Sequence, residues 1–206
     1  AEKMPITEDA PVQQPMSPYG NTKKVGEEII RDTAKASSIN AILLRYFNPI
    51  GAHPTAAIGE LPIGVPQNLV PFITQTAIGL RQELSVFGDD YPTSDGTAVR
   101  DYIHVVDLAK AHVVALERLL EKKNTDRVET FNLGTGTGSS VLEVIQSFER
   151  VSGQKLPYKI VPRREGDVTE AYANTHQANT VLGWKAESTL DEAMASAWKW
   201  EQKIRS

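Results

Sequence analysis

The feature that most constrains the fold is a short apolar run at residues 41–47, Ala-Ile-Leu-Leu-Arg-Tyr-Phe, which lacks polar alternation. Asn40 bounds it on one side and Asn48-Pro49 on the other. Such a run is typical of a strand buried on both faces of a parallel sheet. Open parallel sheets bind ligands beyond the carboxyl ends of their strands. We therefore expect an α/β fold with a ligand crevice at residues 48–53.

Patterns along the rest of the chain alternate between helix and strand, which also favours α/β architecture. Residues 54–68 are rich in proline and glycine and predict a loop. A capping box of Ser140 and Glu143 predicts one helix start, and Asp107 is expected to cap another. The other predicted helices cover residues 19–36, 69–79, 176–182 and 189–203, and the other predicted strands cover 84–87, 99–105, 130–133 and 158–161.

The sheet predicted from this chain is small, with about two parallel strands of its own, so helices on both faces would cover it poorly. Residues 1–18 contain four prolines and no apolar periodicity, and they predict a surface loop. We therefore expect a piece of a longer protein whose first half is absent. The long loop and the short strands after it predict a smaller subdomain that covers the ligand.

Composition narrows the class of protein. The 206 residues are 40% hydrophobic and 23% charged, with a formal net charge of -4, so neither nucleic acid nor a membrane surface is an expected partner. Cysteine is absent, which excludes disulfides and thiolate metal sites and fits a reducing, cytoplasmic location. The sequence contains no apolar run of transmembrane length. The four histidines are too scattered to predict a metal site.

A Tyr-x-x-x-Lys pattern stands at the start of the first predicted helix. Ser17 can cap this helix, Pro18 suits its first turn, and Tyr19 and Lys23 lie four residues apart on one face. A cation held near a phenol stabilises the phenolate, which is one way to obtain a general base near neutral pH. The same spacing is common by chance on amphipathic helices, so alone it identifies no catalytic pair.

Residues 134–138, Gly-Thr-Gly-Thr-Gly, follow a predicted strand and precede a helix, as a dinucleotide-binding loop does. However, Ser139 stands where the last glycine is needed, and no acidic residue follows a strand about 20 positions later. We therefore interpret the segment as a tight turn that packs its backbone against a neighbouring segment.

Arginines beside polar loops suggest a phosphate site. Arg100 ends a predicted strand and Arg164 lies in a charged loop, where each could bind phosphate through two N–H groups. An arginine beside Asp or Glu is equally well explained as a surface ion pair. With Asn48 and Asn68 at other element boundaries, the set fits a nucleoside diphosphate sugar.

Several segments together resemble the UDP-glucose 4-epimerase (UDP-galactose 4-epimerase) family of extended short-chain dehydrogenase/reductases. They are residues 17–23, 44–53, 99–105, 132–136 and 163–168, and they occur in the family's order. The resemblance runs from about residue 5 to the end of the chain. It implies the C-terminal part of a Rossmann-like parallel sheet with helices on both faces, plus a smaller α/β substrate-binding subdomain. The N-terminal NAD-binding half would be absent.

The resemblance also implies a domain organisation. Residues 1–53 would end the NAD-binding Rossmann domain, and residues 54–105 would form mainly the UDP-sugar subdomain. Residues 106–138 would return to the Rossmann sheet, and residues 139–206 would form mainly the C-terminal substrate-binding subdomain.

The mechanism implied is NAD-dependent epimerisation at C4 of a UDP-hexose through a 4-keto sugar. Tyr19 would be the base, Lys23 would hold the nicotinamide ribose, and Phe47 would lie near the nicotinamide. Arg100 and Arg164 would hold the diphosphate, and residues 84–87 would line the uracil pocket. The implied substrate-binding positions are Asn48, Asn68, Leu69, Leu84, Ser85, Phe87, Arg100, Tyr102, Arg164, Asp167 and Ala171. Ala171 stands where some relatives carry a bulky aromatic, which leaves room for the N-acetyl group of UDP-GlcNAc or UDP-GalNAc.

Two alternatives stay open. Another nucleotide-sugar enzyme of the superfamily, such as a dehydratase or decarboxylase, would share Tyr19 and Lys23. A non-catalytic UDP-sugar-binding or dimerisation module is the alternative for the chain alone, which we expect to be inactive without the glycine-rich NAD loop and the catalytic Ser/Thr. Because helix 19–36 matches one that relatives use in a dimeric four-helix bundle, we expect a homodimer.

Overall fold

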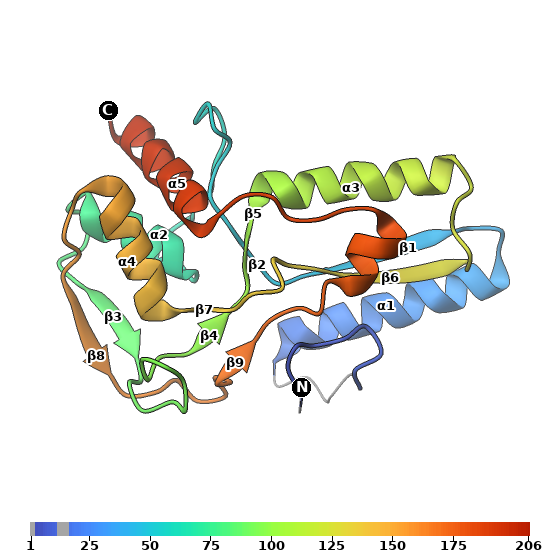
Figure 1. Ribbon diagram of the computed structural model, residues 1–206, viewed down its shortest axis with the longest axis horizontal. Helices are drawn as coiled ribbons and strands as arrows, with labels where there is room; N and C mark the ends of the chain where they lie inside the picture. Colours follow the sequence, from blue (N-terminus) through green and yellow to red (C-terminus); the bar gives the residue numbers. More distant parts are fainter. Residues whose placement is uncertain (1–2, 12–16) are drawn as a thin grey trace.

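The structure is a computed structural model that describes residues 3–11 and 17–206 (Figure 1). Helices and strands alternate, as the α/β prediction required. The helices are α1 (Pro18–Ala36), α2 (Leu69–Ala77), α3 (Val105–Leu120), α4 (Val141–Ser152), the π-helix η1 (Ala178–Leu182) and α5 (Leu190–Arg205). The strands are β1 (Ala41–Tyr46), β2 (Asn48–Ile50), β3 (Leu84–Phe87), β4 (Val99–Arg100), β5 (Tyr102–His104), β6 (Val128–Leu133), β7 (Ser139–Ser140), β8 (Tyr158–Val161) and β9 (Glu170–Ala171).

One end of the molecule is built on the parallel pair β1–β6, with Leu44 opposite Phe131. Helices α1 and α3 run along opposite faces of this pair (Figure 1). The prediction that β1 is buried on both faces was wrong, because only Leu43 of this strand is buried. Within the described residues β1 pairs with β6 alone, so its other edge has no strand beside it.

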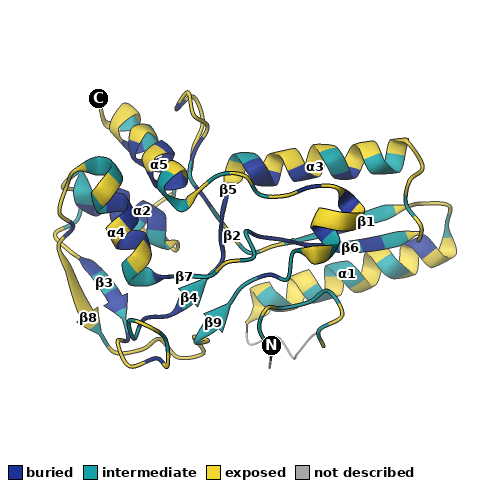
Figure 2. Ribbon diagram, in the orientation of Figure 1, coloured by how far each residue is buried: buried dark blue, intermediate teal, exposed yellow. Residues whose placement is uncertain are grey.

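The other end contains the parallel pair β3–β8 and the helices α2, α4 and α5 (Figure 2). Its core includes Val86 from the strand pair, Phe148 from α4 and Trp198 from α5. The rings of Phe148 and Trp198 meet edge to face with centroids 5.5 Å apart, a geometry that aromatic pairs favour. Strand β3 is buried at alternate positions, whereas β8 is mostly exposed.

Short strands join the two ends. The predicted strand at residues 99–105 is two strands, β4 and β5, interrupted at Asp101. Strand β5 pairs in parallel with β2, an unpredicted strand at the expected crevice, and β4 lies between β7 and β9. These strands carry Asn48, Arg100 and Tyr102, so residues from distant parts of the sequence meet where the two ends join.

The buried carboxylate of Asp101 organises this junction. One of its oxygens accepts hydrogen bonds from the N–H and hydroxyl of Thr135, both at 2.8 Å. The other accepts from the N–H groups of Gly136 and Ala173, both at 3.1 Å. A Cβ atom on Gly134 would lie 2.2 Å from this second oxygen, so only glycine fits there. The 134–138 turn therefore packs against a neighbouring segment, as the sequence predicted.

Helix ends agree with most of the predicted caps. In the capping box of α4, the Ser140 hydroxyl accepts the Glu143 N–H and the Glu143 carboxylate accepts the Ser140 N–H. Thr189 and Glu192 make a second capping box at the start of α5. The expectation for Asp107 was wrong. The α3 cap is His104, whose ring accepts from the Val106 N–H, and the Asp107 side chain instead binds the chain before α5.

Residues 3–11 form a loop, as predicted for the start of the chain, whereas residues 1–2 and 12–16 lie outside the described residues. Ile6 makes a bridge to Ala173, and the Glu8 carboxylate accepts from the Asn132 N–H at 2.8 Å. This loop therefore closes one side of β6. Among the helices of the described segments, none is long and apolar enough to cross a bilayer.

The close approach at Gly134 gives the first testable prediction. Gly134→Ala should lower the free energy of unfolding by about 1–3 kcal/mol, because the new methyl group overpacks against the Asp101 carboxylate. The matched control is Gly26→Ala in α1, where the methyl meets nothing within 4 Å. Removing this helical glycine should raise stability by up to about 1 kcal/mol. Urea unfolding measures both, and equal midpoints for Gly134→Ala and the parent chain would contradict the account.

Candidate functional site

A cleft of about 1160 Å³ lies at the junction of the two ends of the molecule. Its walls come from α1, β1, β2, α2, β3, β4 and β5, together with the charged loop at residues 164–167. The predicted site residues that line it are Tyr19, Lys23, Phe47, Asn48, Asn68, Leu69, Leu84, Ser85, Phe87, Arg100, Tyr102, Arg164 and Asp167. The fold therefore gathers nearly the whole predicted set around one space.

Tyr19 and Lys23 lie on one face of the first turns of α1. The Ser17 hydroxyl accepts the Gly20 N–H at 3.1 Å, which fixes the start of the helix. The Lys23 ammonium lies 5.0 Å from the centre of the Tyr19 ring. Tyr19 is 70% exposed in this chain, so its phenol is accessible from the cleft.

Helix α1 has one buried residue, Ala34, so apolar packing holds it only weakly. Charged side chains make further contacts with the rest of the molecule. Arg45 of β1 donates two hydrogen bonds of 2.7 Å to the Glu27 carboxylate, and Arg31 donates to the Thr130 hydroxyl at 2.8 Å. The Arg45 guanidinium holds the pKa of Glu27 below its usual range. Sequence reasoning missed Glu27, although its position eight residues after Tyr19 places it on the same face of the helix.

Arginine and carboxylate groups line the opposite wall. Arg100 donates to Asp167 at 2.8 Å, and the Arg164 guanidinium lies 3.9 Å from the centre of the Phe87 ring. Asp167 offsets part of the charge of Arg100. In the part of the chain that is described, Arg164 makes no ion pair, so its N–H groups are available to an anion.

Tyr102 and Asn48 face each other across the β2–β5 pair. Burial raises the pKa of the Tyr102 phenol to about 12, with a smaller opposing effect from Arg100. The phenol therefore stays protonated at neutral pH and offers a neutral hydrogen-bond donor. Asn48 itself is exposed to the cleft, and its N–H donates to the Asp101 carbonyl at 3.0 Å.

Strand β3 gives the cleft a backbone edge. Among the described residues, β8 is its one partner, and the N–H groups of Leu84 and Gly88 donate to that side. Because backbone groups alternate along a strand, the N–H groups of Ser85 and Phe87 point to the open side. Such an edge can pair with a planar ligand that carries adjacent donors and acceptors.

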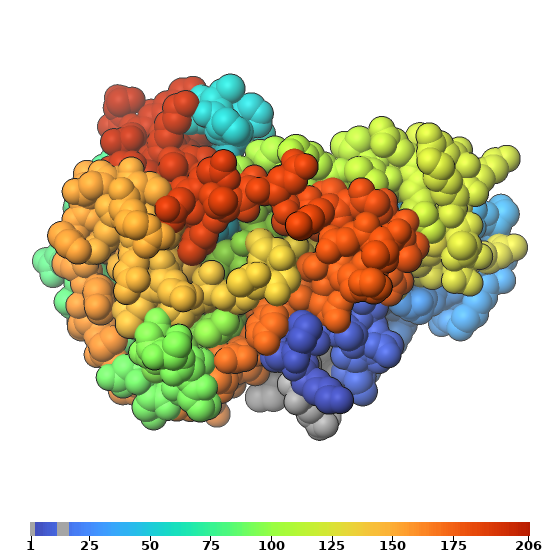
Figure 3. All heavy atoms as spheres, viewed as in Figure 1, coloured from blue at the N-terminus to red at the C-terminus, as the bar shows by residue number. Residues whose placement is uncertain are grey.

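The start of α2 contributes Asn68 and Leu69. The Asn68 amide donates to the Glu60 carboxylate at 2.8 Å, and the Trp200 indole donates to the Glu60 carbonyl at 2.8 Å. The loop that carries Glu60 thus lies against α5, as the cyan and red atoms of Figure 3 show. These contacts fix the loop that leads into the cleft.

Ala171 is the one predicted site residue that does not line the cleft. It ends β9 opposite Arg100, and its carbonyl accepts the Asp101 N–H at 3.0 Å. Its side chain is half-buried, next to the wall rather than in it. No group of three or more His, Cys, Asp or Glu suited to a metal occurs among the described residues.

The family model described as GDP-mannose 4,6 dehydratase matches residues 1–197. The chain belongs to that family and to the extended short-chain dehydrogenase/reductases. The UDP-glucose 4-epimerase of Mus musculus is 53% identical over 97% of this chain, and that of Bacillus subtilis (strain 168) is 51% identical over 97%. The family predicted from the five segments between residues 17 and 168 is therefore confirmed.

Solved structures agree with these relatives. The UDP-glucose 4-epimerase of Stenotrophomonas maltophila, with bound NAD and formylated UDP-arabinopyranose, matches all of this chain with a TM-score of 0.95 and 49% identity. That of Bifidobacterium longum, in complex with NAD+ and UDP, matches 99% of it with a TM-score of 0.92 and 47% identity. The chain spans 57% of the mouse protein and 60% of each of these two structures.

Proposed function

We propose that the full-length protein epimerises UDP-glucose and UDP-galactose at C4 and that this chain supplies its UDP-sugar site and its Tyr–Lys pair. The observation that carries the proposal is the single cleft that joins Tyr19 and Lys23 to a strand edge and two arginines. Its volume of about 1160 Å³ exceeds the roughly 300–1,000 Å³ of an ordinary ligand pocket, so it has room for parts of two ligands.

We assign the uridine diphosphate part of the substrate to the wall formed by α2, β3 and the 164–167 loop. Uracil carries an N–H between two carbonyls, which complements the alternating N–H and C=O groups on the open edge of β3. Arg100 and Arg164 would then bind the diphosphate, since guanidinium groups form paired hydrogen bonds with phosphate oxygens. The hexose would lie toward Asn48 and Tyr102, between the diphosphate and Tyr19.

The cofactor proposed is NAD, whose nicotinamide accepts and returns a hydride when it is bound. The described residues fit such a group: Tyr19, Lys23 and Phe47 lie in one cleft near the carboxyl end of β1, where parallel sheets bind dinucleotides. Tyr19 would take the proton of the sugar's 4-hydroxyl and later return it. Lys23 would stabilise the phenolate and bind the ribose hydroxyls.

Two other activities are weaker explanations. A dehydratase shares the Tyr–Lys pair, and the family model carries a dehydratase name, but the relatives reported above are epimerases. For the chain alone, a non-catalytic UDP-sugar-binding module is compatible with the cleft, and we expect the chain by itself to be inactive. We also propose that UDP-GlcNAc and UDP-GalNAc are accepted, because the small Ala171 stands beside the Arg100 wall.

Turnover by the full-length protein tests this proposal. Tyr19→Phe should lower kcat by at least about 100-fold, because general acid–base catalysis contributes about 10²–10⁴-fold. A coupled assay with UDP-galactose measures the rate, and Tyr158→Phe, which changes a tyrosine outside the cleft, is the matched control. Unchanged turnover in Tyr19→Phe would refute the catalytic assignment. In the same assay, a protein active on UDP-galactose but inert toward UDP-GalNAc would refute the wider substrate range.

We further propose a homodimer formed through α1, in the cytoplasm. Val25 and Ile29 of this helix are exposed apolar residues, which an interface would cover. Light scattering of the full-length protein should give twice the monomer mass, and Ile29→Lys should shift it toward monomer. A monomeric mass for the unmodified protein at micromolar concentration would contradict this.

A further inference from the structure

His104 lies where the two hydrophobic cores of the molecule meet. Its neighbour Tyr102 belongs to the core of α2, α4 and α5, whereas Ile103 belongs to the core of α3 and β6. His104 is 6% exposed, and its imidazole lies between the start of α3 and the side of α5. Residues on both sides of this seam line the cleft.

Hydrogen bonds around the imidazole fix one tautomer. Nδ1 accepts the Val106 N–H at 3.0 Å, so in the neutral ring the proton is on Nε2. Nε2 lies 3.2 Å from the Ser196 hydroxyl oxygen, which also accepts the Ala52 N–H at 3.0 Å. The Ser196 hydroxyl gives its own proton to the Ala193 carbonyl at 2.9 Å. Every donor in this group therefore has an acceptor.

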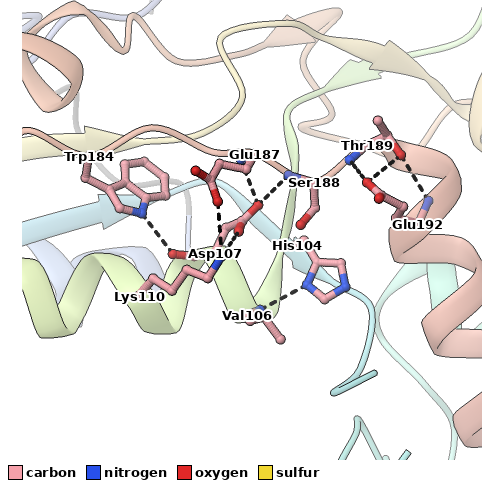
Figure 4. Close-up of polar contacts among 9 residues, drawn as sticks. All are labelled: His104, Val106, Asp107, Lys110, Trp184, Glu187, Ser188, Thr189 and Glu192. Carbon is pink, nitrogen blue, oxygen red and sulfur yellow. Dashed lines mark hydrogen bonds and ion pairs between the residues drawn. The ribbon is translucent and has the colours of Figure 1, made fainter. Parts of the chain in front are cut away.

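The Asp107 carboxylate makes a second connection at the same helix end (Figure 4). The carboxylate accepts hydrogen bonds from the N–H groups of Glu187 and Ser188 at 3.0 and 2.7 Å. The backbone carbonyl of Asp107 accepts the Trp184 indole N–H at 3.1 Å. The start of α3 thus holds both the segment that leads into α5 and α5 itself.

Helix α5 in turn supports the wall of the cleft that we assign to the uridine group. It packs against α2, and its Glu201 carboxylate accepts a hydrogen bond of 3.3 Å from the Thr74 hydroxyl of α2. Its Trp200 holds the loop that leads to Asn68 through the Glu60 carbonyl. A shift of α5 would therefore move Asn68 and Leu69 relative to β1.

We propose that His104 is a positioning residue, which as a neutral imidazole holds the Ser196 hydroxyl of α5 where it accepts the Ala52 N–H of the loop after β2. In this way it sets the cleft geometry for the uridine diphosphate group. The inference rests on the function proposed above. It assigns His104 no contact with the ligand, since His104 does not line the cleft.

Protonation would break this arrangement, because an N–H at Nδ1 would face the Val106 N–H. Burial lowers the pKa of His104. Asp107 of α3 and Glu192 of α5 act in the opposite direction, and Lys110 of α3 adds to the lowering. A lowered pKa means that the stabilising contact is present above the ordinary histidine value of about 6.5 and is lost as pH falls through the folded-state value.

Titration of UDP into this chain at about pH 7.5 and at a series of lower pH values tests the inference, with paired variants. His104→Asn keeps a cap for α3 but cannot reach Ser196, whereas His104→Gln can reach Ser196 but is a poorer cap. Ser196→Ala removes the same contact from the α5 side. His176→Gln, at an exposed histidine outside the seam, is the matched control.

At about pH 7.5, His104→Asn and Ser196→Ala should each weaken UDP binding by about three- to tenfold. Binding must then supply the free energy that restores the cleft geometry, which is about that of one lost hydrogen bond. His104→Gln should stay within about twofold of the parent chain, since it retains that bond. As the pH falls through the lowered pKa of His104, the parent chain and His104→Asn should converge, because the imidazole of the parent chain then becomes charged. Titration of the UDP phosphate affects all variants equally and cancels in this comparison.

Hydrogen exchange of the Ala52 amide, compared between chains at one pH, gives a readout that needs no ligand. It should be faster in His104→Asn and Ser196→Ala than in the parent chain or His176→Gln. Unchanged exchange, or a His104→Asn chain that binds UDP as tightly as the parent chain at about pH 7.5, would overturn the inference. If the exchange behaves as expected but the parent chain binds no UDP, the positioning of the loop stands and the proposed function is refuted.

Discussion

The buried Asp101 carboxylate is the interaction on which the site depends. A carboxylate removed from water costs several kcal/mol unless hydrogen bonds replace its hydration. Here backbone N–H groups of the 135–136 turn and of Ala173, with the Thr135 hydroxyl, replace it. Because Arg100 and Tyr102 flank Asp101, the same bonds that satisfy the carboxylate fix the direction of two residues of the cleft wall. The glycine-rich turn at residues 134–138 therefore donates hydrogen bonds to this carboxylate, which explains its sequence without a role in dinucleotide binding.

The two walls of the cleft are held by different means. The wall of α2 and β3 rests on a core of large apolar side chains, which close packing makes rigid. The helix that carries Tyr19 and Lys23 instead depends on the Glu27–Arg45 pair, with little apolar burial of its own. An exposed apolar face on that helix is what a subunit contact or the remainder of a longer protein would cover. The proposed division, with uridine at one wall and chemistry at the other, follows this difference.

Much of the fold could be predicted from local patterns. The helix from Pro18 to Ala36, the strand at residues 84–87 and the Ser140–Glu143 cap all depend on residues close in sequence. What the sequence could not predict depends on distant partners. His104 rather than Asp107 caps α3 because the helix begins at Val105, and the Asp107 carboxylate bonds to residues about 80 positions away. The roles of Asp101 and Glu27 exist only once β6 and β1 are in place. Nearly all of the site residues implied by the resemblance lie around one cleft in the structure, whereas Ala171 lies beside that cleft.

The central claim is that this chain recognises uridine diphosphate through the edge of β3 and the two arginines. Calorimetric titration of the chain with UDP and with CDP tests it most directly, because the two ligands share the ribose diphosphate and differ in the donor and acceptor order of the base. Saturable binding of UDP is predicted, with CDP at least about tenfold weaker, since one mismatched buried hydrogen bond costs about 1–3 kcal/mol. Equal affinities for the two nucleotides, or no binding of UDP, would contradict the account.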